Sequence, residues 1–245
     1  MPGIFAQYPY LWTSLVLLAV AAALLAAERR HRRSLWFAGS AGMLFGLFSF
    51  EFIPWYWDPA VTMHFIASPE DLLFSFATGT IAWWLALKMT GGKLELELGL
   101  AGCIRRGILF ALPGVAIAYS LGLTVMNHRP IETTLIGVGV MGLVFAWLKR
   151  GFILPICCSA LLFGLFYLVL LKLALLAFPD FINAWHPQIQ PGYTVFGVPP
   201  FELYWALGYG LVFPLYLLLV FRATAAGREG LPGEAFGVPR TEAGE

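Results

Sequence analysis

Long apolar stretches, separated by charged or proline-rich breaks, are the feature that most restricts how this chain folds. A helix needs about 20 predominantly apolar residues to cross the hydrocarbon of a bilayer. Segments of this kind occupy residues 12–27, 35–53, 72–87, 108–126, 131–148, 152–178 and 201–221. Residues 28–33 between the first two read Glu-Arg-Arg-His-Arg-Arg, which is too polar for hydrocarbon. The pattern predicts an all-α polytopic membrane protein with seven transmembrane helices.

Composition supports this class and excludes several others. Of the 245 residues 60% are hydrophobic and only 12% charged, whereas soluble domains are about 45–50% apolar and about 25% charged. A formal net charge of +1 gives no support to nucleic-acid binding, which needs a basic patch or stripe. The three cysteines have neither a disulfide framework nor metal-ligand spacing, and we interpret His64 and His186 as interfacial polar residues. We expect no metal and no cofactor.

The distribution of basic residues predicts an orientation. With the N-terminus outside, every Lys and Arg except Arg129 and Lys172 falls in a cytoplasmic loop or in the C-terminal tail. Cytoplasmic loops of membrane proteins carry such an excess. We therefore expect a multi-pass protein of the cell membrane with an outside N-terminus and a cytoplasmic C-terminus. Residues 223–245, rich in Gly, Pro, Glu and Arg, are predicted to form a disordered cytoplasmic tail.

A weak internal repeat divides the apolar segments into two groups of three. An acid-Phe-Ile, a Trp-x-Pro and a proline-initiated helix start with Glu occur twice in the same order. The two sets are Glu51-Phe52-Ile53, Trp57-x-Pro59 and Pro69-Glu70, and Asp180-Phe181-Ile182, Trp185-x-Pro187 and Pro200-Phe201-Glu202. Residues 1–90 and 131–222 are thus predicted to be parallel three-helix repeats, joined by residues 91–130, which contain the fourth segment.

The repeat brings several carboxyl groups to the outer face, chief among them Glu70, Asp71 and Glu202. One interpretation is capping, because carboxylates stabilise helix N-termini. The other is catalysis, because ionisable groups at membrane depth usually mark function and crowding at low dielectric favours protonation. A protonated carboxyl group in a dry aromatic pocket is a general acid. The side chains that we expect to contact a substrate there are Glu51, Trp57, Phe74, Asp180, Trp185, Trp205 and Tyr209.

Two features of this face have alternative interpretations. Its aromatic rings belong either to the interfacial belt of Trp and Tyr that many membrane proteins carry or to a pocket whose ring faces stabilise a cation. Lys172, near the outer end of the sixth segment, either snorkels outward or pairs with a carboxylate such as Glu202.

The motifs resemble the heterodimeric-type lycopene cyclase domain family in its fused two-repeat form. The resemblance rests on Trp57-x-Pro59 leading to Pro-Glu-Asp-Leu-Leu-Phe at 69–74, and on Trp185-x-Pro187 leading to Pro-Phe-Glu at 200–202. It covers about residues 35–90 and 160–220. In that family each three-span half carries a Pro-x-Glu-[Glu/Asp]-x-x-Phe motif, and members cyclise the ends of lycopene to β-ionone rings without net redox change.

The resemblance implies proton-initiated cyclisation, with Glu70 and Asp71 as the first acidic pair and Glu202 as the acid of the second motif. We therefore expect a lycopene cyclase-like enzyme that acts on a carotenoid or other isoprenoid. Glu70 is the expected acid or its hydrogen-bonded partner, and Asp71 and Glu202 share the proton relay. In the second motif Leu203 stands where the family has a second acid.

Two alternatives remain open at this point. The missing second acid favours a non-catalytic lipid- or pigment-binding protein, or a subunit of a larger membrane complex. A proton-coupled transporter is suggested by the repeats and the membrane carboxyl groups. The partners expected in every case are membrane lipids and a hydrophobic isoprenoid or lipid ligand, and no nucleic acid.

Overall fold

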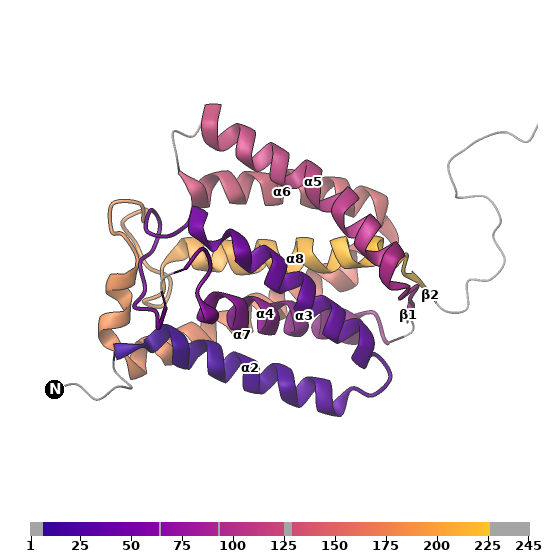
Figure 1. Cartoon of the computed structure of the whole chain (residues 1–245), viewed down its shortest axis with the longest axis horizontal. Coiled ribbons are helices and arrows are strands. Elements are labelled where there is room, and N and C mark those ends of the chain that lie inside the picture. Colours follow the sequence, from indigo (N-terminus) through magenta and orange to yellow (C-terminus); the bar gives the residue numbers. More distant parts are fainter. Residues whose placement is uncertain (1–6, 64, 93, 125–128, 226–245) are drawn as a thin grey trace, which may run out of the picture.

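The structure, a computed structural model, describes residues 7–63, 65–92, 94–124 and 129–225, and most of them are helical (Figure 1). The α-helices are α2 (Pro9–Ala27), α3 (Arg32–Gly46), α4 (Pro69–Met89), α5 (Leu100–Thr124), α6 (Pro130–Leu148), α7 (Ile153–Ala177) and α8 (Pro200–Val220). Short 3-10 helices are η1 (Leu47–Glu51), η2 (Arg150–Phe152) and η3 (Pro179–Ala184). Strand β1 (Leu94–Glu95) pairs antiparallel with β2 (Thr224–Ala225). Residues 226–245 of the predicted tail lie outside the described residues.

Six helices in the described part, α2 and α4 to α8, are long and apolar enough to cross a membrane. The chain is therefore an all-α polytopic membrane protein, as the sequence predicts. The segment expected at residues 35–53 differs, because its α-helix ends at Gly46 and continues as η1 to Glu51. By helical rise α3 spans about 22 Å and η1 about 10 Å. Together they match the hydrocarbon thickness of about 30 Å.

Close contact with α4 explains why α3 ends early. A Cβ at Gly46 would lie 2.5 Å from Ser75 Oγ and 3.1 Å from the carbonyl oxygen of Asp71, so glycine is required at this approach. Beyond Gly46 the chain tightens into η1, and the Ser49 hydroxyl donates to Asp71 Oδ2 at 3.0 Å. Pro54 follows, and proline cannot continue a helix. The last turn of this segment is shaped to reach the start of α4.

Prolines begin four of the helices. Pro9, Pro69, Pro130 and Pro200 stand at the first turns of α2, α4, α6 and α8, where the N–H that proline lacks would have no helical partner. These four N-termini lie at one end of the bundle, on the left in Figure 1, together with residues 52–63, 65–68 and 185–199. We call this the loop end. The opposite end holds β1 and β2, and we call it the arginine end.

Helices α4 and α8 form the centre of the bundle. α4 contacts α2, α3, α7 and α8, and α8 contacts α4, α5, α6 and α7. Figure 1 shows α5 and α6 along one side of this pair and α2 along the other. Because α4 and α8 begin at the loop end, the side chains of their first turns are enclosed by the loops and the neighbouring helices. Glu70, Asp71 and Glu202 are all buried there.

Small residues allow α3 and α4 to approach closely, as is common between membrane helices. A Cβ at Gly42 would overlap the carbonyl oxygen of Ser75, and a Cβ at Gly79 would lie 2.8 Å from the carbonyl oxygen of Ala38. The backbones themselves are therefore in contact, and added volume has nowhere to go.

We predict that Gly42→Val lowers the free energy of unfolding by about 1–3 kcal/mol, the usual effect of overpacking. Gly139→Ala on α6 is the matched control, because nothing lies within 4 Å of a Cβ at Gly139. Alanine there favours the helix by about 0.8–1 kcal/mol. Unfolding in mixed micelles with increasing dodecyl sulfate, followed by circular dichroism, measures both effects. Equal stability of the two variants would contradict the close α3–α4 contact.

Candidate functional site

A cavity of about 710 Å³ lies between the two sides of the bundle and extends from the loop end along α8 to Tyr216. One wall is formed by the end of α3 and η1, and the opposite wall by α5 and α6. The first turns of α4 and α8 supply Asp71 and Glu202, and α7 supplies Tyr167. A volume of several hundred Å³ with mostly apolar walls and a few polar groups is typical of a small-molecule site.

Three neutral donors hold Glu202. The Tyr56 hydroxyl and the Trp185 indole N–H donate to Oε1 at 2.8 and 2.9 Å, and the Tyr167 hydroxyl donates to Oε2 at 2.6 Å. Burial and the charge of Glu202 raise the pKa of Tyr56 far above its ordinary value, so its hydroxyl keeps the proton that it donates. Both oxygens of a buried carboxyl group are thereby satisfied without a cation.

Asp71 is held in a similar way and also caps α4. Its Oδ2 accepts from the backbone N–H and the hydroxyl of Ser68, each at 2.8 Å, and from the Ser49 hydroxyl. Ser68 in turn accepts from the Asp71 N–H, which completes a capping box. The Tyr10 hydroxyl donates to Oδ1 at 2.9 Å. Asp71 therefore both caps α4 and lines the cavity.

The two Trp-x-Pro motifs meet between these carboxyl groups. Trp57 and Trp185 form an antiparallel backbone bridge, and the Asp58 N–H donates to the carbonyl of Ala184 at 2.7 Å. The two indole rings stack at 5.7 Å, and Tyr10 packs edge-on against Trp57 at 4.6 Å. Since Tyr10 donates to Asp71 and Trp185 to Glu202, one aromatic chain joins the two acidic groups.

Aromatic side chains continue from Glu202 along one face of α8. Trp205, Tyr209, Phe213 and Tyr216 follow at helical spacing, and all four line the cavity. Trp205 stacks on Tyr209 at 5.1 Å and Tyr209 on Phe213 at 4.9 Å. From Glu202 to Tyr216 the helix rises about 21 Å. We call these four residues the aromatic stripe.

Glu70 lies elsewhere. It is fully buried and does not line the cavity. Its Oε1 accepts from the backbone N–H of Thr62 at 2.8 Å, and its Oε2 has no partner among the described residues. Pro69 and Pro200 start α4 and α8, so Asp71, rather than Glu70, occupies the helix position that Glu202 occupies in α8. The adjacent carboxyl groups of α4 thus point to different surroundings.

The other predicted site residues divide between the cavity and the surface. Glu51, Trp57, Phe74, Trp205 and Tyr209 line the cavity, whereas Trp185 is buried outside its lining and donates to Glu202. Asp180 is exposed on η3 and does not line the cavity.

Lys172 forms no ion pair with Glu202 in the described part of the chain. Its Nζ would lie 3.1 Å from a Cβ at Gly197, in the loop before α8. The side chain therefore extends toward the loop, which is the snorkelling alternative.

Sequence reasoning missed Tyr10, Tyr167 and Ser49. Tyr167 and Tyr10 each carry one hydroxyl within a long apolar helix, and a buried hydroxyl in such surroundings needs a partner. That signal indicates a polar contact but does not say with which helix. Among the described residues no group of three or more His, Cys, Asp or Glu side chains is placed to hold a metal ion.

Comparison of the chain with protein-family models, with curated protein sequences and with solved structures finds no match.

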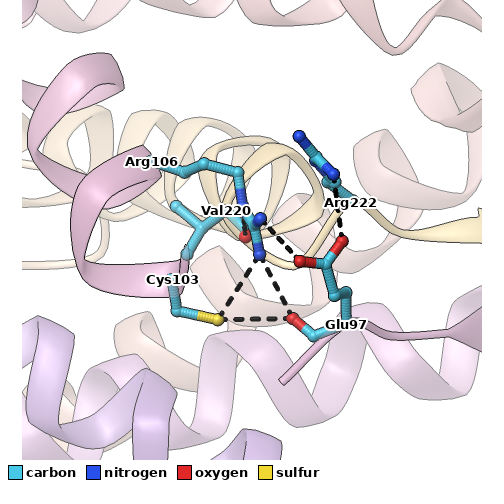
Figure 2. Close-up of polar contacts among 5 residues, drawn as sticks. All are labelled: Glu97, Cys103, Arg106, Val220 and Arg222. Atoms are coloured by element: carbon cyan, nitrogen blue, oxygen red, sulfur yellow. Dashed lines mark hydrogen bonds and ion pairs between the residues drawn. The ribbon is translucent and has the colours of Figure 1, made fainter. Parts of the chain in front are cut away.

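A second polar cluster, which the sequence analysis did not identify, lies at the arginine end (Figure 2). The buried guanidinium of Arg106 donates from Nε to the carbonyl of Val220 at 2.6 Å and from Nη1 to Glu97 Oε1 at 2.8 Å. Arg222 Nη1 lies 3.3 Å from Glu97 Oε2, and the Cys103 thiol donates to the carbonyl of Glu97. These contacts tie the segment before α5 to the end of α8 and satisfy one of its terminal carbonyls.

This cluster predicts a pH dependence of stability. The hydrogen bond from Arg106 lowers the pKa of Glu97, and the charges of Arg106 and Arg222 act in the same direction. Partial desolvation of the carboxyl group opposes this shift but does not cancel it. A carboxyl group whose pKa is lower in the folded state stabilises the folded protein at pH values above its unfolded-state pKa, which is about 4.3 for Glu. This contribution is lost as the pH falls through the folded-state pKa. The wild type should therefore have a higher melting temperature than Glu97→Gln at pH 7, and this difference in melting temperature should shrink below about pH 4.3. Melting temperatures of both proteins measured across about pH 3–8, a range that brackets the ordinary Glu pKa of about 4.3, test this prediction. A difference in melting temperature that stays constant across this range would contradict it.

Proposed function

We propose that this protein is a lycopene cyclase-like membrane enzyme that closes a ring at the end of a linear carotenoid or related isoprenoid. The observation that carries the proposal is that Asp71 and Glu202, from the first turns of the two central helices, line one aromatic cavity. The motif resemblance to the lycopene cyclase domain family supports the same chemistry.

The reaction requires an acid, a base and a dry cavity. A carboxyl O–H adds its proton to a terminal C=C bond, which leaves a carbocation. A second C=C bond of the same chain attacks that cation and forms the ring C–C bond. A carboxylate then removes a proton from a neighbouring carbon and restores a C=C bond, so atoms and electrons balance and no redox partner is needed. The ring faces around the cavity stabilise the cation, and exclusion of water prevents its capture.

Asp71 and Glu202 are the groups that we assign to this proton exchange, one as donor and the other as acceptor. Each is placed by several hydrogen bonds from neutral groups, which fixes the geometry that proton transfer requires. The aromatic stripe supports a linear substrate, because it extends the cavity along α8 away from the acids. In this arrangement Glu70 positions residues 61–63 through Thr62 and does not contact the substrate.

We predict that the chain converts lycopene to cyclic products in a lycopene-accumulating bacterial host, measured by chromatography of the extracted pigments. Asp71→Asn and Glu202→Gln should abolish the products, because each removes a carboxyl group from the cavity wall. Asp180→Asn is the matched control and should retain activity, since Asp180 is exposed and outside the cavity.

Glu70→Gln distinguishes Glu70 from Asp71 as the reacting acid of α4. The placement of Glu70 behind the cavity wall predicts that this variant keeps most of its activity. An inactive but folded Glu70→Gln with an active Asp71→Asn would instead support Glu70, the acid that the sequence favours. Cyclic products from Glu202→Gln at the wild-type level would contradict the proposed site.

One observation favours a binding protein without turnover. Every oxygen of Asp71 and Glu202 already accepts at least one hydrogen bond within the protein. Neither carboxyl group therefore needs a hydrogen-bond donor from the ligand. Lycopene that co-purifies with well-expressed protein and is recovered unchanged would identify this second function.

We also propose that the loop end faces the outside of the cell membrane. The basic residues Arg29, Arg106, Lys149 and Arg222 belong to the arginine end, whereas the loop end has Arg129, which is paired with Glu132 at 3.5 Å, and Lys172. The positive-inside rule then supports a cytoplasmic arginine end.

Reporter fusions at the C-terminus test this orientation. Green fluorescent protein fused after Glu245 should fluoresce, because the fusion point follows α8 on the cytoplasmic side, and alkaline phosphatase at the same position should be inactive. The reverse pair of results would invert the orientation without changing the fold.

A further inference from the structure

The cavity reaches the outer surface of the bundle on one side. Phe48, Phe50 and Trp55 line the cavity and are also 44%, 46% and 63% exposed. Side chains that face a cavity and the exterior at once mark the edge of an opening. The two walls beside this opening, α3 with η1 and α5 with α6, pack on different helices. α3 packs on α2 and α4, whereas α5 packs on α6 and α8.

The opposite wall of the cavity, on α5 and α6, includes small residues beside larger ones such as Phe110 and Met141. Ala111 and Gly114 of α5 and Gly137 of α6 line the cavity there. A Cβ at Gly114 would lie 3.1 Å from Met141 Cγ, so the Met141 side chain packs directly against this glycine.

The opening lies at hydrocarbon depth. Phe48 is about 25 Å along the α3–η1 segment from Arg32, by the rise of the two helix types, within the hydrocarbon thickness of about 30 Å. One edge of the opening is formed by η1, the 3-10 helix with which this segment ends. Acyl chains, rather than water, therefore face Phe48 and Phe50.

We infer that an apolar, chain-like lipid enters the cavity sideways from the bilayer, between η1 and α6, and that its end moves toward Asp71 and Glu202. The identity of this lipid as an isoprenoid rests on the proposed function, but the position of the opening does not. The route is continuous with the aromatic stripe, because Phe45 at the end of α3 contacts both Phe213 and Tyr216. A linear molecule that enters there comes to lie along α8.

The test uses the full chain in lipid vesicles, with Cys157 and Cys158 replaced by serine and the buried Cys103 kept. Phe48→Cys places a thiol at the edge of the opening. Leu44→Cys is the matched control, because Leu44 lies four residues earlier, on α3, and is 63% exposed but does not line the cavity. Each thiol is modified with a bulky apolar maleimide. The protein is then incubated with lycopene-loaded vesicles and re-isolated at intervals, and bound lycopene is measured by its visible absorbance.

Modification at position 48 should slow lycopene uptake several-fold, and modification at position 44 should leave it unchanged. Equal rates for the two modified proteins would overturn lateral entry. A nitroxide at position 48 gives an independent readout, since it should be more accessible to oxygen than to a water-soluble nickel chelate. The opposite accessibility would show that the opening faces water and would also overturn the inference. If unmodified protein takes up no lycopene, the proposed function fails, and the nitroxide result still decides which solvent the opening faces.

Discussion

Two carboxyl groups buried at the starts of the two central membrane helices, without a cationic partner among the described residues, constrain the rest of this structure. Burying an ionisable group at low dielectric is unfavourable unless hydrogen bonds replace its hydration. Here the donors are tyrosine, tryptophan and serine side chains and one backbone N–H. They come from α2, η1, α7 and both loops of the loop end, so the arrangement of these elements depends on the same few contacts.

This requirement accounts for features that otherwise look unrelated. α3 ends early and tightens into η1, which brings Ser49 to Asp71. The chain between η3 and α8 returns across the bundle, which brings Trp185 to Glu202 and against Trp57. The glycines of α3 let η1 and α4 approach closely enough for these bonds to form. A cavity remains where the two sides of the bundle do not meet, and its polar groups are concentrated at one end.

Much of the fold was predictable because its signals are local. Apolar length predicted the membrane class, and the prolines at 69 and 200 predicted the starts of α4 and α8. The sequence also placed Glu202, Trp57 and Trp205 at one site. It did not predict the end of α3, because Gly46 is explained only by its contact with α4. It favoured Glu70 over Asp71 as the reacting acid, because adjacent residues differ in surroundings only once the helix is packed. Tyr10 and Tyr167 were missed because their partners lie 61 and 35 residues away.

We propose that Asp71 and Glu202 face one end of a linear apolar ligand that lies along α8. A structure determined from protein saturated with lycopene tests this arrangement. We predict elongated density beside Trp205, Tyr209, Phe213 and Tyr216, with one end in contact with both carboxyl groups. Density bound elsewhere on the bundle, or a cavity occupied only by water in saturated protein, would contradict it.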